Sequence, residues 1–261
     1  MIKPRKILET KALAIGYFQK GQPCVVASGI SLELQQGELI AVVGANGVGK
    51  STLLRTLSRV QKPLEGSIYI KEKSLETYSP LALATELSLV LTDPIASQNL
   101  TVQELVALGR QPYTNWLGTL TITDLEQTKK ALEQMHIVDL SDKKCSDLSD
   151  GQLQKALIAR AIAQDTPLII LDEPTTHLDI YHKIYVLKLM QKLTRDLQKT
   201  LFFSTHEIDL AIQLCDKILV MTPENRYYGT PLELIEEGCF SELFPKDLID
   251  FDIKTGRFRI Q

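Results

Sequence analysis

The stretch Val42–Leu54, with the sequence VVGANGVGKSTLL, decides the fold. The apolar residues Leu39–Val42 predict a strand before the glycines, and the apolar spacing after them predicts a helix. Residues 44–51, GANGVGKS, fit the pattern G-x-x-x-x-G-K-[ST] at every fixed position. In this pattern backbone N–H groups surround an anion, and the N-terminus of the helix adds positive potential. The alternative is a glycine-rich turn that binds nothing, but the flanking strand and helix favour a nucleotide cradle.

Two carboxylates follow a second apolar strand in the segment LIILDEP, Leu168–Pro174. A strand that ends in Asp172 places this carboxylate at the edge of the sheet where Mg²⁺ lies beside the phosphates. Glu173 follows directly and suits the polarisation of a water molecule against the γ-phosphate. Two solvated carboxylates that merely close a strand are the alternative. The phosphate cradle favours the metal-and-water interpretation, in which Lys50 reaches the phosphates and Ser51 ligates Mg²⁺.

Composition excludes several functional classes for this chain of 261 residues. The formal net charge of −3 gives no sign of a surface that binds nucleic acid. No stretch approaches the roughly 18 apolar residues that a membrane helix needs, so we expect any membrane role to come through a partner. The cysteines Cys24, Cys145, Cys215 and Cys239 are widely spaced, which is typical of reduced thiols in a cytosolic protein.

The order of the expected elements indicates an α/β fold. Strands are expected at Ile7–Ile15 and Ile30–Leu34, with residues 17–24 as a turn-rich link. Helices are expected from about residue 101 to residue 164, and Thr101 with Glu104 forms a capping-box pattern at their start. After residue 164, strands alternate with helices, and one such helix is expected at Ile184–Leu197. This alternation predicts a parallel sheet covered by helices.

Three further segments distinguish this chain from other proteins with a phosphate cradle. LSDGQLQKALIARAIAQ, residues 148–164, resembles the LSGGQ signature of the ATPases of ABC transporters. TTHLD, residues 175–179, is similar to their D-loop, and FFSTHE, residues 202–207, is similar to their switch-histidine segment. With the cradle and the Asp172 strand, these motifs follow the order and spacing of the family over residues 5–230.

The resemblance implies the fold class: a P-loop NTPase of the ABC type with a parallel-sheet core, an antiparallel β subdomain and an inserted helical subdomain. Residues 1–261 would form a single nucleotide-binding domain, with the helical subdomain at about 100–164 and a C-terminal extension at about 231–261. The implied cofactors are ATP and Mg²⁺. The residues implied to hold ATP are Tyr17, Gly44, Asn46, Gly47, Gly49, Lys50, Ser51 and Thr52.

The resemblance also assigns roles outside the cradle. His206 would contact the γ-phosphate beside Glu173, and Tyr17 would stack on adenine, with ordinary packing as the alternative for this ring. Ser149, Gly151 and Gln152 offer a hydroxyl and exposed amides at a helix start, so they suit a second anion site. In the family this site serves the nucleotide of a second copy in trans, and Asp179 bridges the two copies. An ordinary helix N-cap is the alternative.

One position departs from the family. A glutamine that touches Mg²⁺ and the attacking water is expected where this chain has Thr92, next to Asp93. Either residue is a possible metal ligand in its place, so the set of magnesium ligands is Ser51, Asp172 and Thr92, with Asp93 as the rival of Thr92. Asp150 also replaces a glycine of the signature.

The segment LTVQELVALGRQPYTNW, residues 100–116, and the tail FDIKTGRFRI, residues 251–260, resemble the importers of ferric siderophores, heme and cobalamin. The resemblance implies an ATP-hydrolysing subunit that binds a second copy of itself and polytopic permease subunits, and that acts indirectly with a substrate-binding protein. We expect it at the cytoplasmic face of a bacterial plasma membrane. We expect no nucleic acid among its partners. A soluble ATPase outside transport and an exporter ATPase stay open as alternatives, and so does the cargo.

Overall fold

The computed structural model describes residues 5–91, 99–176, 178–244, 249–252 and 256–260. Its centre is a six-stranded sheet with the order β11-β10-β4-β9-β8-β7, in which β11 alone is antiparallel to its neighbour. The strands are β4 (Leu39–Gly44), β7 (Leu87–Val90), β8 (Leu168–Leu171), β9 (Thr200–Ser204), β10 (Lys217–Met221) and β11 (Arg226–Gly229). Every residue of β4, β8 and β9 is buried, as expected where helices cover both faces of a parallel sheet.

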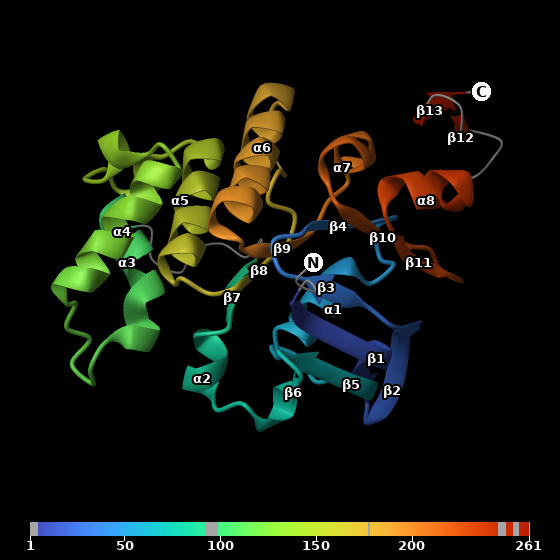
Figure 1. Ribbon diagram of the computed structural model, residues 1–261, viewed down its shortest axis with the longest axis horizontal. Helices are drawn as coiled ribbons and strands as arrows, with labels where there is room; N and C mark the ends of the chain where they lie inside the picture. The colour runs from blue at the N-terminus through green and yellow to red at the C-terminus, as the bar shows by residue number, and fades with distance from the viewer. Residues whose placement is uncertain (1–4, 92–98, 177, 245–248, 253–255, 261) are drawn as a thin grey trace.

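The hydrophobic core consists of two clusters, and alternate side chains along β4 belong to one or the other. Leu39, Ala41 and Val43 belong to one cluster, which includes buried residues of α6 (Ile180–Leu197) and α7 (Ile208–Leu214). Ile40 and Val42 belong to the other, which includes the apolar residues of α1 (Lys50–Leu57). Since successive side chains of a strand point to opposite faces, α6 and α7 lie on one side of the sheet and α1 on the other (Figure 1).

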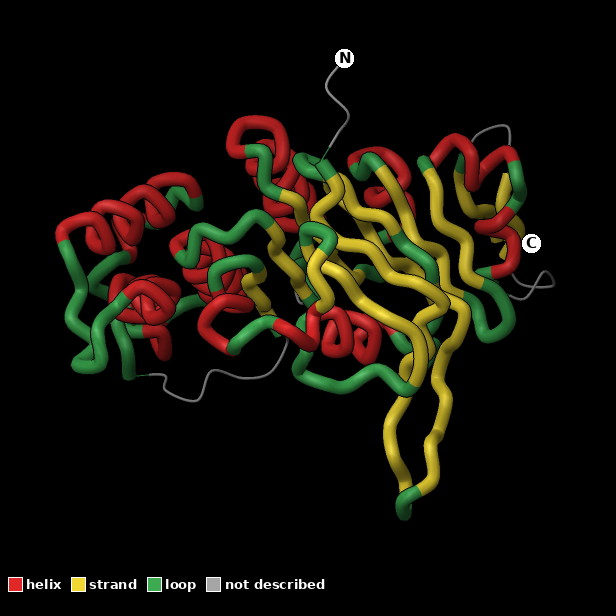
Figure 2. The backbone as a smooth tube through the Cα atoms, turned by 60° about the horizontal axis from the view of Figure 1, so that its bottom comes forward, coloured by secondary structure: helices red, strands yellow, loops and turns green. Residues whose placement is uncertain are grey.

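A second sheet is antiparallel and has the order β2-β1-β5-β6, with β3 paired to β1. Its strands are β1 (Lys6–Gln19), β2 (Gln22–Ile30), β3 (Glu33–Gln35), β5 (Glu65–Ile70) and β6 (Lys73–Ser74). The predicted link at residues 17–24 is wrong, because the β1–β2 pairing continues to Gln19 and Gln22. Lys20 and Gly21, with φ of 51° and 80°, alone make the turn, and the hairpin projects from the body (Figure 2). The predicted strand Ile30–Leu34 is divided between the end of β2 and β3.

Three helices pack against one another on the left of Figure 1: α3 (Val102–Ala107), α4 (Ile122–Gln134) and α5 (Asp150–Ala163). The predicted capping box at the start of α3 is confirmed. The Glu104 N–H donates to Thr101 Oγ1 over 3.2 Å, and the Thr101 N–H donates to Glu104 Oε2 over 2.8 Å. Two donors at the helix end are thereby satisfied by local sequence alone.

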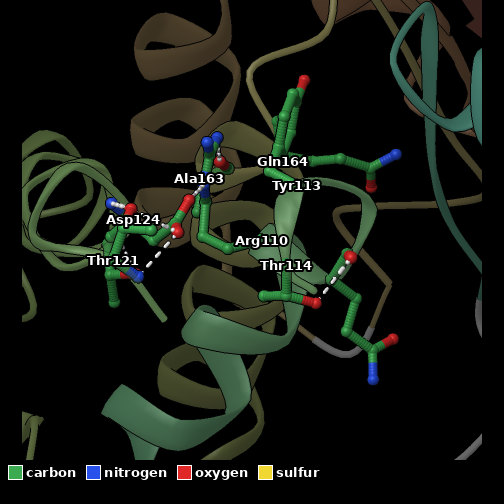
Figure 3. Close-up of polar contacts among 9 residues, drawn as sticks. Arg110, Tyr113, Thr114, Thr121, Asp124, Ala163 and Gln164 are labelled. Atoms are coloured by element: carbon green, nitrogen blue, oxygen red, sulfur yellow. Dashed lines mark hydrogen bonds and ion pairs between the residues drawn. The ribbon is translucent and has the colours of Figure 1, made fainter. Parts of the chain in front are cut away.

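A buried ion pair joins these helices (Figure 3). Arg110 Nε lies 2.9 Å from Asp124 Oδ1, and the two side chains are 7% and 3% exposed. Arg110 Nη1 also donates to the carbonyl oxygen of Ala163 at the end of α5, over 2.8 Å. Asp124 Oδ2 accepts from the backbone N–H and the hydroxyl of Thr121, which caps α4. One arginine therefore links the turn after α3 to α4 and α5.

The remaining elements extend these parts. Helix α6 begins at Ile180, four residues before the predicted Ile184, because Asp179 caps it. Its residues 180–183 precede the apolar run from which the prediction was made. The other helices and strands are α2 (Pro80–Ala84), α8 (Pro231–Glu236), β12 (Ile249–Asp252) and β13 (Arg257–Ile260), and the 3₁₀ segments are Leu75–Thr77, Leu108–Tyr113, Val138–Leu140, Cys145–Asp147 and Cys239–Glu242.

Candidate functional site

The glycine loop leaves β4 and enters α1 at the carboxyl end of the central sheet. A Cβ at Gly44 would lie 2.4 Å from the carbonyl oxygen of Met221, and one at Gly49 would lie 2.6 Å from Val26 Cγ1. Gly49 has φ of 106° and Gly47 has φ of 81°, which is the left-handed region. The loop therefore needs glycine for both space and backbone angle. Asn46, between two of these glycines, is exposed.

Lys50 begins α1 and folds back over the loop. Its Nζ donates to the carbonyl oxygens of Gly44, over 2.8 Å, and Ala45, over 3.1 Å, and the residue is only 5% exposed. Burial lowers the pKa of Lys50, although the negative charges of Glu173 and Asp172 oppose this effect. A cation held against a loop of this shape suits the recognition of phosphate groups.

Two hydroxyls converge on one oxygen of Asp172, just beyond the end of β8. Ser51 Oγ lies 3.1 Å from Asp172 Oδ1, and Ser204 Oγ lies 2.6 Å from the same oxygen. A hydroxyl and a carboxylate are hard oxygen donors, which fit Mg²⁺. In the described ranges no group of three or more His, Cys, Asp or Glu residues gathers as a metal site. One carboxylate with substrate phosphates and water is the usual way in which proteins hold Mg²⁺, so the donor set fits this ion.

Glu173 leaves the strand with φ of 46°, an uncommon angle for this residue type. Its Oε1 lies 2.8 Å from His206 Nε2, and its Oε2 accepts from the Thr176 hydroxyl over 2.9 Å. Burial acts to raise the pKa of Glu173, but the hydrogen bonds from Thr176 and His206 and the charge of Lys50 outweigh it. The net pKa is lowered, so the group is an ionised carboxylate at neutral pH and can accept a hydrogen bond from water.

The signature segment forms the start of α5. The Ser149 hydroxyl accepts from the Gln152 N–H, and the Gln152 side chain accepts from the Ser149 N–H, as in a capping box. A Cβ at Gly151 would lie 3.3 Å from Leu178 Cδ2, so the signature lies beside the segment that leads into α6. Within the residues that the structure describes, no hydrogen bond or ion pair joins Ser149 or Gln152 to the glycine loop.

Asp179 caps α6. Its Oδ1 accepts from the His182 N–H over 2.9 Å, and its Oδ2 lies 2.8 Å from His182 Nδ1. These contacts with His182, the backbone hydrogen bond foremost, hold the pKa of Asp179 below its usual value. The cap pattern of an aspartate followed by a helix is visible in the sequence, but the partner histidine was not predicted.

Tyr17 lies on β1 opposite Cys24 of β2, and the tyrosine is 50% exposed. A hydrogen bond with the Cys24 thiol raises the pKa of Tyr17. The ring is therefore not packed into the core. It lies on the same hairpin as Val26, whose Cγ1 is next to Gly49 of the glycine loop. Thr52, the last residue assigned to the cradle, is half-buried in the first turn of α1. Thr92 and Asp93 lie outside the described residues.

A comparison with family models decides which family these features belong to. Residues 27–176 match the family described as ABC transporter. The chain belongs to the ABC transporter family. This confirms the resemblance from the sequence and with it the ATP-binding, ATP-hydrolysing class of the chain.

Individual ABC transporter proteins agree with the family model. The chain is 35% identical over 241 residues to petrobactin import ATP-binding protein FpuD of Bacillus anthracis, covering 92% of this chain and 87% of that protein. It is 31% identical over 249 residues to iron(3+)-hydroxamate import ATP-binding protein FhuC of Bacillus subtilis, covering 95% and 90%. A solved structure described as a metal-chelate type ABC transporter in an inward-facing conformation superposes with a TM-score of 0.79, at 28% identity, over 92% of this chain and 89% of that one. The predicted fold class of the ABC ATPase is confirmed.

The ABC motifs led the sequence analysis to most, but not all, of the residues that meet at this site. The structure brings Lys50, Ser51, Asp172, Glu173 and His206 together, as expected. It adds two hydroxyls that were not predicted, those of Ser204 and Thr176. Both residues lie inside quoted motifs, so the available signal was a hydroxyl side chain at a buried strand end or next to a carboxylate. Such residues are common, and sequence alone gave no reason to single them out.

Proposed function

We propose that this chain is the ATP-hydrolysing subunit of an importer whose cargo is an iron(III) chelate. The observation that carries the catalytic part is the contact of Glu173 Oε1 with His206 Nε2 over 2.8 Å, next to the Ser51–Asp172 pair. The similarity to a protein named for iron(3+)-hydroxamate import supports this cargo over heme and cobalamin. The described residues include no helix long and apolar enough to span a membrane.

The cradle residues bind and orient the nucleotide. Lys50 and the loop N–H groups from Gly44 to Gly49 hold phosphate groups, and Thr52 extends this contact into the first turn of α1. Ser51 and Asp172 are the residues that hold Mg²⁺. When bound there, Mg²⁺ supplies neutralisation of the negative charge on the phosphates. The half-exposed ring of Tyr17 stacks on the adenine.

Glu173 polarises the attacking water. Its lowered pKa keeps it ionised, so a carboxylate oxygen accepts the hydrogen bond that strengthens the nucleophile. His206 orients this carboxylate, donating from Nε2 to Oε1, and we expect it to contact the γ-phosphate as well. Thr176 fixes the second carboxylate oxygen. A positioned base typically contributes about 10²–10⁴-fold to a rate.

The signature acts on a second copy of the chain. An anion site at the start of α5 is formed by Ser149, Gly151 and Gln152. Asp179 caps α6, and the preceding residue, Leu178, lies beside Gly151. The chain already has one cradle, so a second anion site is best used on the nucleotide of a partner. ATP therefore joins two copies head to tail, and hydrolysis lets them separate.

The same subunit docks on polytopic permease subunits at the cytoplasmic face of a bacterial plasma membrane, and it acts on a substrate-binding protein through them. In this organisation, residues of about 100–164 form a helical subdomain and residues of about 231–261 a C-terminal extension. Large apolar side chains are exposed near the start of α4, which supports a protein partner there: Trp116 at 91%, Leu117 at 67% and Ile122 at 78%.

The test of the proposed function is the variant Glu173→Gln. We expect it to bind ATP with wild-type affinity, to hydrolyse ATP more slowly by about 10²-fold or more, and to accumulate as an ATP-bound dimer. Glu224→Gln, an exposed glutamate in a loop, is the matched control and keeps full turnover. Hydrolysis by Glu173→Gln at near the wild-type rate would refute the assignment. Co-purification with a polytopic membrane protein, and ATP-dependent uptake of an iron(III) chelate by vesicles holding the complex, separate import from export and from a soluble role.

A further inference from the structure

Ser204 is a fully buried residue at the centre of the site, and the motifs assign it no role. It is the last residue of β9, and its exposure is 0%. β9 lies between β4, which leads into the glycine loop, and β8, which leads into the two carboxylates. Ser204 is paired with Val42 of β4. Its side chain is thus placed between the cradle and the carboxylates by the order of the sheet.

The single hydroxyl of Ser204 makes two contacts to consecutive residues. Its O–H donates to Asp172 Oδ1 over 2.6 Å. Its oxygen accepts from the backbone N–H of Glu173 over 2.8 Å. A hydrogen bond to a carboxylate is short and strong, and Ser204 and Asp172 are only 0% and 2% exposed, so solvent does not readily replace this contact. One atom therefore fixes both a side-chain rotamer and a backbone N–H.

The two contacts meet different needs of the site. Asp172 Oδ1 receives the Ser204 and Ser51 hydroxyls together, so the carboxylate plane is set from two sides. Glu173 has φ of 46°, a conformation that persists only when its surroundings hold it. The Ser204 oxygen holds the N–H of this strained residue. The direction in which the Glu173 side chain leaves the strand depends on that angle.

We propose that Ser204 is a positioning residue that couples the metal-binding carboxylate of Asp172 to the water-polarising carboxylate of Glu173. It is fully buried, and it acts by holding the two groups in one relative arrangement. This inference rests on the roles proposed above for Asp172 and Glu173. Removing an outer partner of a metal ligand typically costs 10–100-fold in metal affinity or activity.

The experiment compares Ser204→Ala with Thr200→Val in the full chain. Thr200 is a matched control, because it lies on the same strand, is also 0% exposed, and bridges two backbone groups with its hydroxyl. It is four residues away, or about 13 Å along a strand. Both variants lose a buried hydroxyl, so both should melt at lower temperature than the wild type.

Only Ser204→Ala should move the functional readouts. We expect the Mg²⁺ concentration for half-maximal binding of adenylyl imidodiphosphate, measured by calorimetry, to rise about tenfold. Binding of the same nucleotide in EDTA should stay within twofold of the wild type. In hydrolysis assays at saturating Mg²⁺, kcat should fall about tenfold or more while KM for ATP stays within threefold.

A Mg²⁺ midpoint of Ser204→Ala within twofold of both the wild type and Thr200→Val overturns the proposal. If Ser204→Ala does not fold, Ser204→Cys keeps the volume with a much weaker hydrogen-bonding atom, and an unshifted midpoint there overturns it equally. The failure of the proposed function is distinguishable: Lys50→Ala would then bind the nucleotide as well as the wild type, whatever Ser204→Ala does.

Discussion

Asp124→Ala should destabilise the chain far more than an ordinary surface change, because it leaves the buried positive charge of Arg110 without its counter-ion. Arg110 is 6% exposed, and its Nε contacts Asp124 Oδ1 over 2.9 Å. Breaking a buried pair by removing one partner costs about 3–5 kcal/mol. Thr121 also loses its reciprocal contact at the start of α4, which adds about 1 kcal/mol. For a chain of this size each 1 kcal/mol lowers the melting temperature by roughly 2–4 °C, so we expect a drop of about 10 °C or more.

Urea unfolding followed by circular dichroism measures this change, with the slope checked for two-state behaviour. Glu126→Ala, an exposed carboxylate on the same helix, should stay within about 0.5 kcal/mol of the wild type. The double variant Arg110→Met with Asp124→Ala removes the stranded charge, so it should be more stable than Asp124→Ala alone. A loss below about 1 kcal/mol in Asp124→Ala, or strict additivity in the double variant, contradicts the reasoning.

The same pair sets a pH dependence with a defined sign. Hydrogen bonds from Thr121, and then the charge of Arg110, hold the pKa of Asp124 below its usual value. A lowered pKa in the folded state adds stability that is complete above the unfolded pKa of about 3.9. This stability is lost as the pH falls through the still lower folded pKa. The difference between the wild type and Asp124→Asn should therefore be constant from pH 7 to about pH 5 and shrink below about pH 4.

Three predictions concern the nucleotide site. Tyr17→Ala should weaken ATP binding by about tenfold, while Tyr17→Phe, which keeps the ring, should bind as the wild type does in fluorescence titrations; equal affinities would exclude stacking. Ser149→Arg should bind ATP as a monomer without hydrolysing it, and mixing it with Lys50→Ala should restore part of the activity, because one composite site stays complete. A mixture that stays inactive, with an ATP-bound structure showing no partner at Ser149, would refute action in trans. Thr92→Ala should raise the Mg²⁺ requirement of hydrolysis and Asp93→Asn should not; the opposite ranking would give the ligand role to Asp93.

The glycine loop and the buried strands around it were predictable because their signals are local. Gly44 and Gly49 have no room for a Cβ, so their spacing reports the shape of the loop directly. The strands β4, β8 and β9 are uninterrupted apolar runs, which follow from burial on both faces. Asp172 and Glu173 were found for the same reason, since each follows such a run.

The hairpin tip was not predictable in this way. Phe18 and Gln19 pair with Pro23 and Gln22, but these side chains are exposed and show no alternation of polarity. Pairing across a turn is then encoded only by Lys20 and Gly21. Ser204 was missed for a different reason: its partners are 31 and 32 residues away in sequence and meet it only through the order of the strands.

Helix α5 connects the signature residues at its start to the region of β7 at its end. A rigid helix of this length would act as a lever between them. Its 14 residues, Asp150–Ala163, lie between the caps Ser149 and Gln164 and span about 21 Å. At its far end Gln164 Nε2 donates to the carbonyl oxygens of Ala84 and Leu87, next to β7, and Arg110 binds the Ala163 carbonyl. Three hydrogen bonds therefore anchor that end of the helix. A rotation of about 10° about that end would carry Ser149 through about 4 Å, which is more than the length of a hydrogen bond. If the signature acts in trans as proposed, a small tilt at the base of β7 would be enough to engage or withdraw it from a nucleotide held by another copy.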